Sequence, residues 1–262
     1  MNKQKYTLIK ITAALLIGAG MLRISALIFK GKGPELVVAI PAYLVSITVL
    51  ILLAVLFRET DRLTGLRHGW KAFFTKGWYI LIVSGIFVLL LGIGLSREKN
   101  LVFSPVNLIC FAVVCLLTAC YEEIWFRGII LGILDRQGRI KGRSFWKTAC
   151  IGSALFGATH LLNLLHRPDY ILGTITQVLY AFSLGMILSM VIYCGGNIGA
   201  AVLLHAVFNF CGSLSEVFVQ STGAQTGDMT AASAVYILVL LMPGIFAARR
   251  MYRKKEKQKC VG

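Results

Sequence analysis

The sequence predicts an all-α, polytopic membrane protein of about eight transmembrane helices. Three observations support this fold class: 57% of the 262 residues are hydrophobic, only 15% are charged, and the mean hydropathy is +0.78. Soluble domains carry about a quarter charged residues, and one soluble core could not bury this much apolar surface. Lipid is therefore the expected solvent of the chain.

The apolar residues fall into eight runs, each close to the ~20 residues that a helix needs to cross the hydrocarbon core. Each run is expected to be helical, because a helix satisfies its own backbone hydrogen bonds in lipid. The first run contains Lys10 and Arg23, so its ends are the least defined. The expected spans are 7–28, 35–57, 78–95, 103–121, 147–165, 171–193, 198–218 and 231–248.

The lysines and arginines orient these spans. With a cytoplasmic N-terminus and eight crossings, 20 of the 27 cationic residues fall on the cytoplasmic side, near residues 3–5, 58–76, 127–147 and 249–259. This positive-inside pattern predicts a multi-pass protein of the cell (plasma) membrane with both termini cytoplasmic. The net charge of +16 is thus a topology signal, and we expect membrane lipids and no nucleic acid as partners. The side opposite receives Lys30, Lys32, Arg97, Lys99 and Arg167.

Two further features are structural. The basic segment 58–77 is amphipathic, with aromatic residues at 70, 73 and 74, and is expected to lie along the cytoplasmic face or to form a solvated loop. The seven cysteines include no CxxC pair, which argues against a zinc knuckle or a redox motif and favours a role as small apolar side chains in helices.

Ionisable residues inside apolar runs are costly and indicate a functional site. Glu122 and Glu123 end the fourth run, and Arg127 lies one helical turn after Glu123, so these two can pair. Glu122 points about 100° away from Glu123 on a helix, which leaves it able to face a cavity and act as a general base on water. The plain alternative is a charged helix end at the membrane interface.

Two histidine clusters follow in later runs. His160 shares a helix face with Asn163, and His205 shares one with Asn209. Each histidine alone is well explained by hydrogen bonding between helices, but the acids, the arginine, the histidines and the asparagine together form a hydrolytic set. Ser153 and Cys211 are available as nucleophiles but lie in no nucleophile motif, which favours water.

The ordered motifs EExxxR (Glu122 to Arg127), FxxxH (Phe156 to His160) and HxxxN (His205 to Asn209) resemble those of CPBP, the CaaX protease and bacteriocin-processing family, also called Abi. The resemblance covers roughly residues 101–212. It implies an intramembrane endopeptidase with a polar cavity open toward the cytoplasm. It divides one membrane domain into N-terminal helices with the amphipathic segment (1–100), a catalytic core (101–218), and a last span with a basic tail (219–262).

The resemblance also implies roles for six residues. Glu122 is the base that activates water, Glu123 the accompanying acid paired with Arg127, and His160 the residue that holds the water. His205 and Asn209 would stabilise the oxyanion. Family members are often described as metalloproteases, and Glu122, His160 and His205 could hold zinc, although the chain has no HExxH motif.

One distance is inconsistent with these spans. His160 lies ~20 Å along the fifth span, and His205 lies ~10 Å along the seventh. A shared cavity requires the fifth span to start after residue 147 or the Glu122 cluster to lie deeper in the membrane, and we expect both.

The expected substrate is a peptide or protein near the cytoplasmic face, cleaved in peptide maturation or bacteriocin immunity in a prokaryote. Two alternatives remain: a non-catalytic immunity or scaffold protein of the same fold, and a proton-coupled transporter, for which the sequence shows no inverted repeat. The sequence does not indicate an oligomeric state.

Overall fold

A computed structural model describes residues 3–29, 35–61, 63, 69–96, 103–195, 198–218 and 229–261, and in these ranges the chain forms helices and no strand. The fold class predicted from composition is confirmed. The helices are α1 (Lys3–Phe29), α2 (Glu35–Phe57), α3 (Gly69–Leu95), α4 (Pro105–Glu123), the π-helix η1 (Ile124–Ile130), α5 (Leu131–Ile140), α6 (Phe145–Thr159), the 3₁₀-helix η2 (His160–Leu165), α7 (Ile171–Gly195), α8 (Ile198–Ser213), α9 (Ser215–Phe218), α10 (Ala231–Leu241) and α11 (Gly244–Val261).

The chain is a multi-pass membrane protein. In the part that the structure describes, seven helical segments are long and apolar enough to cross a membrane, and Ile198–Ser213 is a shorter apolar helix. The seven are Gln4–Ser25, Val37–Phe57, Lys71–Leu95, Pro105–Ile140, Phe145–Leu165, Ile171–Gly195 and Ala231–Lys259. The expected span 198–218 is therefore corrected: α8 ends at Ser213, and α9 is a separate short helix.

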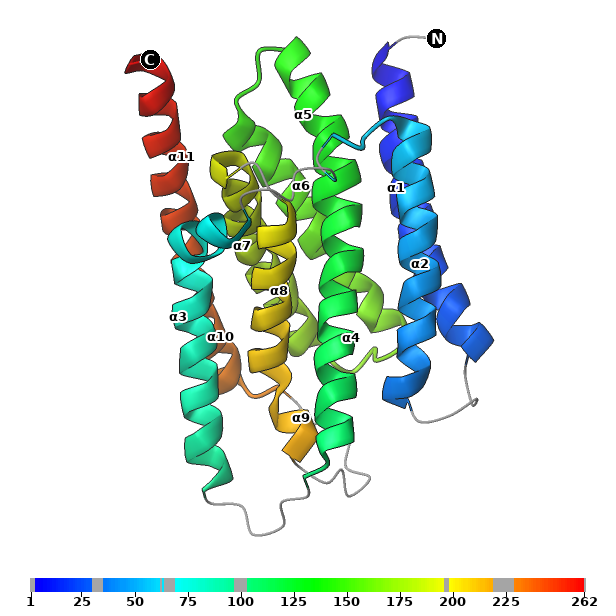
Figure 1. The fold of residues 1–262 in the computed structure, drawn as a ribbon, viewed down its shortest axis with the longest axis vertical. Coiled ribbons are helices and arrows are strands. Elements are labelled where there is room, and N and C mark those ends of the chain that lie inside the picture. The colour runs from blue at the N-terminus through cyan, green and yellow to red at the C-terminus, as the bar shows by residue number, and fades with distance from the viewer. Residues whose placement is uncertain are drawn as a thin grey trace.

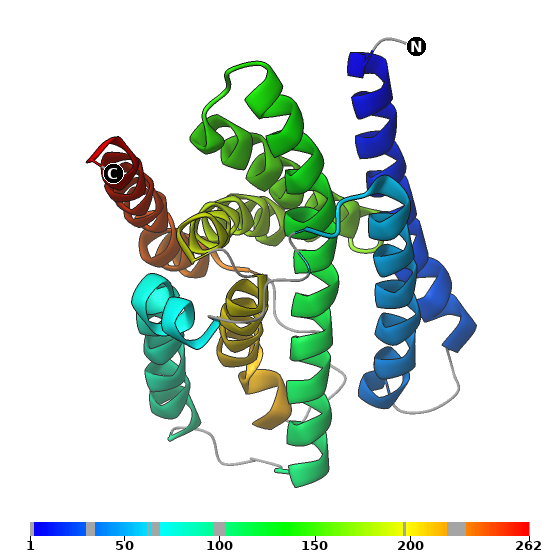
Figure 2. The same cartoon turned by 45° about the horizontal axis from the view of Figure 1, so that its top comes forward.

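The basic segments gather at one end of the bundle. The start of α1, the end of α2, the turn between α5 and α6 and the end of α11 all lie there (Figure 1). Figure 2 turns this end toward the viewer and shows the α5–α6 turn and α11 projecting from it. The opposite-side residues Lys30, Lys32, Arg97 and Lys99 lie outside the described residues, as do Arg62 and Arg67 of the basic segment.

The third span begins earlier than expected. Gly69–Gly77 forms the first turns of α3 rather than a separate segment along the membrane surface. The reason is packing: Ala72 and Phe73 are buried in the same apolar core as residues of α7 and α8. Residues 62 and 64–68 of the predicted amphipathic segment lie outside the described ranges.

The fourth span continues through the paired acids instead of ending at residue 121. Helices α4, η1 and α5 form one unbroken column, Pro105–Ile140, of 36 residues (Figure 1). Ser104 caps its start by accepting a hydrogen bond from the backbone N–H of Asn107 at 3.3 Å. Glu122 lies 17 residues after Pro105 and 18 before Ile140, so the acids occupy the middle of the column.

This depth resolves the inconsistency between the histidine positions. The expectation that the fifth span starts late is wrong, because α6 begins at Phe145. The expectation of a deeper Glu122 cluster agrees with the length of the column. His160 is the first residue of η2, where α6 ends.

Helix α1 fixes the middle of the column. The hydroxyl of Tyr121 donates to the carbonyl of Gly18, and Nε1 of Trp125 donates to the carbonyl of Ala14 at 2.9 Å. Both side chains are buried, so these donors are satisfied within the bundle. The two bonds flank Glu122 and Glu123 and hold that turn in place.

Close packing of α6 on α7 depends on Gly157. A Cβ at this position would lie 2.6 Å from the backbone carbonyl oxygen of Val178, which has no freedom to move aside. Helix α8 lies between α3 and α4 (Figure 1) and packs against both. The middle of the column, α6, α7 and α8 therefore surround one region of the bundle.

Candidate active site

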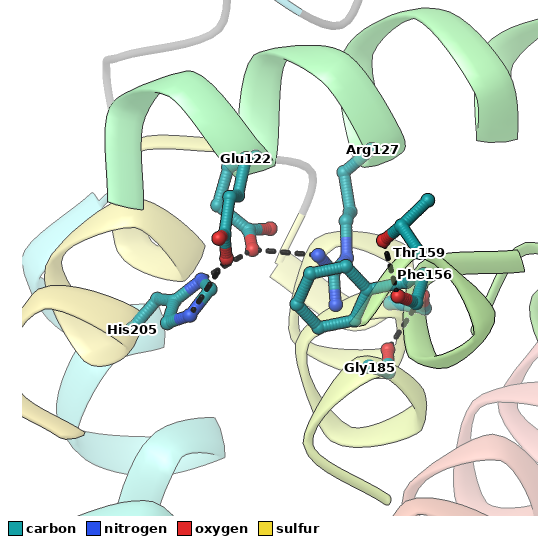
Figure 3. Close-up of polar contacts among 8 residues, drawn as sticks. Glu122, Arg127, Phe156, Thr159, Gly185 and His205 are labelled. Atoms are coloured by element: carbon teal, nitrogen blue, oxygen red, sulfur yellow. Dashed lines mark hydrogen bonds and ion pairs between the residues drawn. The ribbon is translucent and has the colours of Figure 1, made fainter. Parts of the chain in front are cut away.

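A buried ion pair forms where α4 meets η1. Oε1 of Glu123 lies 2.8 Å from Nη1 of Arg127 and also 2.8 Å from Nδ1 of His205. The three side chains are 0%, 2% and 3% exposed, respectively. The expected Glu123–Arg127 pair is present, and His205 joins it from α8 (Figure 3).

Glu122 has a different environment. Its Oε2 lies 3.4 Å from Nε2 of His205, and its side chain is 20% exposed. The imidazole of His205 therefore faces a carboxylate with each ring nitrogen (Figure 3). The two adjacent acids have different environments, as the helix geometry predicts. Glu123 is buried against polar partners, and Glu122 reaches open space.

That open space is a cavity of about 260 Å³. Four of the six predicted site residues line it: Glu122, His160, His205 and Asn209. Glu123 and Arg127 lie behind this surface. Asn163 does not line the cavity; it is exposed and donates to Oε1 of Gln177 at 2.9 Å.

The ring of Phe156 packs against Arg127 and both histidines. Its ring centroid lies 4.4 Å from Cζ of Arg127, 5.3 Å from the ring centroid of His160 and 6.0 Å from that of His205. Gly185 leaves room for the guanidinium, because a Cβ there would lie 3.2 Å from Nη2 of Arg127 (Figure 3). The FxxxH motif signals Phe156 in the sequence, whereas nothing there signals Gly185.

The structure adds cavity residues that sequence reasoning missed. Gln177 and Tyr180 of α7 and Thr118 of α4 line the cavity beside Glu122. Polar residues of these types are common in membrane helices as interhelical hydrogen-bonding groups. Their positions in the sequence therefore carry no signal that separates them from ordinary packing residues.

Residues 104–211 match the model of a family described as "Type II CAAX prenyl endopeptidase Rce1-like". This description is that of the CPBP family, to which the chain is similar over these residues. The matched range contains every predicted site residue, from Glu122 to Asn209. Comparisons with curated proteins and with solved structures gave no match. The family that this model describes is one of proteases.

The matched segment contains a π-helix directly after the paired acids. Helix η1 covers Ile124–Ile130, and the backbone N–H of Leu131 donates to the carbonyl of Phe126, five residues earlier. Short π-helical segments inside α-helices occur frequently at functional sites. Here the segment contains Arg127, so it sets the direction from which the guanidinium reaches Glu123.

The donors around Glu122 bear on the possibility of a bound metal. Glu122 and His205 approach one another, and the contact of Nδ1 of His205 with Glu123 resembles the carboxylate–histidine support of metal ligands. Within the described ranges, however, no three His, Cys, Asp or Glu side chains are placed to hold a metal ion. His160 does not complete a set with Glu122 and His205, so these three candidate ligands are not arranged as a zinc site in the described residues.

The two nucleophile candidates of the sequence do not line the Glu122 cavity. Ser153 is buried in α6, and its Oγ would lie 3.0 Å from a Cβ at Gly185. Cys211 lines a separate hollow between α3, α8 and α10. Neither residue lines the cavity that Glu122 faces.

Proposed function

We propose that this chain hydrolyses a peptide bond of a membrane-associated peptide or protein with a water molecule activated by Glu122. One observation carries the proposal: Glu122 is the partly exposed acid of the pair and shares a cavity with His160, His205 and Asn209. A cavity with a base and several hydrogen-bonding groups matches the requirements of a hydrolase site.

In the proposed reaction, Glu122 accepts a proton from water while the water oxygen bonds to the carbonyl carbon. The resulting oxyanion accepts a hydrogen bond from the carboxamide of Asn209, and His160 holds the attacking water. When the C–N bond breaks, the proton held by Glu122 passes to the leaving nitrogen. The products are a new carboxyl terminus and a new amino terminus, and no other reactant is required.

The ion pair positions this machinery. Arg127 and His205 both contact Oε1 of Glu123, which fixes the orientation of the imidazole. Nε2 of His205 then orients the carboxylate of Glu122. Because both ring nitrogens face carboxylates, we assign His205 mainly to positioning and leave Asn209 as the main oxyanion donor. Supporting groups of this kind determine how well a site is preorganised.

The walls of the cavity indicate the substrate class. Apolar residues from three helices, including Phe111, Val114, Leu184 and Phe208, line the cavity beside the polar groups. A site of this composition favours hydrophobic residues next to the cleaved bond. We place the activity at the cytoplasmic face of the plasma membrane of a prokaryote, in peptide maturation or in immunity to a bacteriocin, both of which would use the same cleavage.

The test is cleavage of a peptide library by the purified chain in lipid, with Glu122→Ala and Cys211→Ala as paired variants. We expect cleavage by the wild type and by Cys211→Ala, and none by Glu122→Ala. A chelator is added in a parallel reaction. Loss of cleavage with the chelator, restored by added zinc, would replace the water mechanism with a metal-dependent one; cleavage by Glu122→Ala would refute the role of this residue.

A further inference from the structure

A second polar hollow lies far from the acids, where α11 passes beside the start of α3 and the end of α7. It has a volume of about 310 Å³. Four cationic side chains line it: Lys76 of α3 and Arg250, Lys254 and Lys255 of α11. It shares no lining residue with the Glu122 cavity. We call it the basic pocket.

No acidic side chain lines the basic pocket. Helix α11 contains one acid, Glu256, and this carboxylate is already engaged: it accepts from the hydroxyl of Tyr193 at 2.5 Å and pairs with Nζ of Lys259 at 3.1 Å. Among the described residues, none of the four pocket cations forms an ion pair. Four like charges gathered in one hollow attract an anion.

The pocket is built from well-fixed elements. A Cβ at Gly195, near the end of α7, would lie 2.7 Å from Cβ of Ala72, so α7 and α3 are in close contact there. Pro243 interrupts the helix between α10 and α11. At this break, the hydroxyls of Tyr79 and Ser183 donate to the carbonyls of Leu240 and Leu241, each at 2.5 Å. These bonds fix the direction in which α11 leaves the bundle.

Exposed aromatic side chains lie beside the cations of the pocket. Trp78 lines it and is 46% exposed. Phe74 and Phe246, on the two helices that border the pocket, are exposed as well. Tryptophan beside lysine and arginine is the pattern found at membrane–water interfaces. A matching ligand therefore carries negative charge at one end and hydrocarbon at the other.

We infer that the basic pocket binds the phosphate headgroup of an anionic phospholipid, with the cations on the phosphate and the acyl chains along Trp78. Basic pockets between membrane helices recognise such headgroups. The proposed peptidase reaction does not use this site. An experiment can therefore refute the lipid site without refuting the peptidase proposal, and the reverse.

Native mass spectrometry of the full-length chain in detergent measures the affinity for the first lipid molecule that binds to each protein. Phosphatidylglycerol is compared with phosphatidylcholine of the same acyl chains. The pocket variant is Lys76→Gln/Lys255→Gln. The control is Arg253→Gln/Lys257→Gln, which also removes two positive charges. Both of these residues are on α11 and line the neighbouring open surface rather than this pocket. Thermal unfolding without lipid confirms that both variants are folded.

For the wild type, phosphatidylglycerol should bind about tenfold more tightly than phosphatidylcholine, and the pocket variant should lose this preference while the control keeps it. If both variants lost the preference for phosphatidylglycerol equally, the pocket would be refuted. The preference would then come from a general attraction of the anionic lipid to basic residues. Equal affinity of the wild type for the two lipids would refute it as well. Displacement of phosphatidylglycerol by millimolar inorganic phosphate would overturn the lipid assignment in favour of a free phosphate site.

Discussion

Nδ1 of His205 lies 2.8 Å from Oε1 of Glu123, so residues 82 positions apart in the sequence meet in a buried contact between α8 and the end of α4. The same oxygen accepts from Arg127. This arrangement makes Glu123 the shared partner of a cation and an imidazole, and it leaves Glu122 free to face the cavity. The predictions below follow from this division of roles.

Arg127→Ala should destabilise the protein by about 3 kcal/mol, because it leaves the Glu123 carboxylate buried without its cation. Glu122→Gln, which is nearly isosteric and partly exposed, should cost much less. Arg139→Ala is the matched control: it breaks another i, i+4 pair, Asp135–Arg139, whose arginine is 72% exposed. Its expected cost is below about 1 kcal/mol. Thermal unfolding in detergent ranks the three, and equal stabilities would contradict a buried ion pair.

Gly157→Ala should cost about 2 kcal/mol and reduce cleavage, because its Cβ would collide with the carbonyl of Val178 and push α6 away from α7. Phe156 and His160 move with that helix. Gly152→Ala in the same helix is the control, since its Cβ would meet the side chain of Leu131 at 3.4 Å, an ordinary contact. A Gly157→Ala protein as stable and active as Gly152→Ala would show that the helices are not packed this closely.

Asn209→Ala should lower kcat by about 100-fold with little change in KM or in stability, which is the pattern expected when an oxyanion donor is removed. Asn107→Ala provides the control, because Asn107 is exposed near the start of α4, uses only its backbone N–H in the cap, and does not line the cavity. Its kcat should stay close to that of the wild type. A change in KM alone for Asn209→Ala would assign this residue to substrate binding instead.

The topology predicts that the α5–α6 turn and the end of α11 share the cytoplasmic side. Cysteines introduced at Lys141 and Lys257 should react with a membrane-impermeant thiol reagent only after the cells are opened. A cysteine at Ser96, at the other end of α3, should react in intact cells. Labelling of the unaltered chain measures the background from native cysteines. Reaction of Ser96→Cys and Lys257→Cys from the same side would contradict this orientation.

Much of the fold could be predicted from the sequence because lipid allows few solutions for a long apolar run. The helix ends were less predictable. The fourth span continues past residue 121, since Glu123 and Arg127 neutralise each other and Tyr121 is satisfied by Gly18. The third begins at Lys71 because Ala72 and Phe73 find partners in the core.

The site was only partly predictable. Helical spacing could indicate the Glu123–Arg127 pair, because both residues lie on one helix. Spacing within one helix could not indicate that His205 would contact both acids, since this depends on how α8 packs against α4. The π-helix after Glu123 could not be predicted either. No residue in this chain marks the place where the backbone hydrogen bonds change from four residues back to five residues back. Gln177 and Tyr180 enter the cavity through the rotation of α7, which the sequence leaves open.

The most direct test of the proposed mechanism is the single-turnover rate of peptide cleavage by wild type and Glu122→Gln in the same lipid. Glutamine keeps the shape of the side chain but cannot accept a proton from water. The mechanism predicts that the rate falls by at least about 100-fold, while thermal stability and substrate affinity stay near those of the wild type. A Glu122→Gln protein that cleaves at a rate close to that of the wild type would contradict the central role of Glu122.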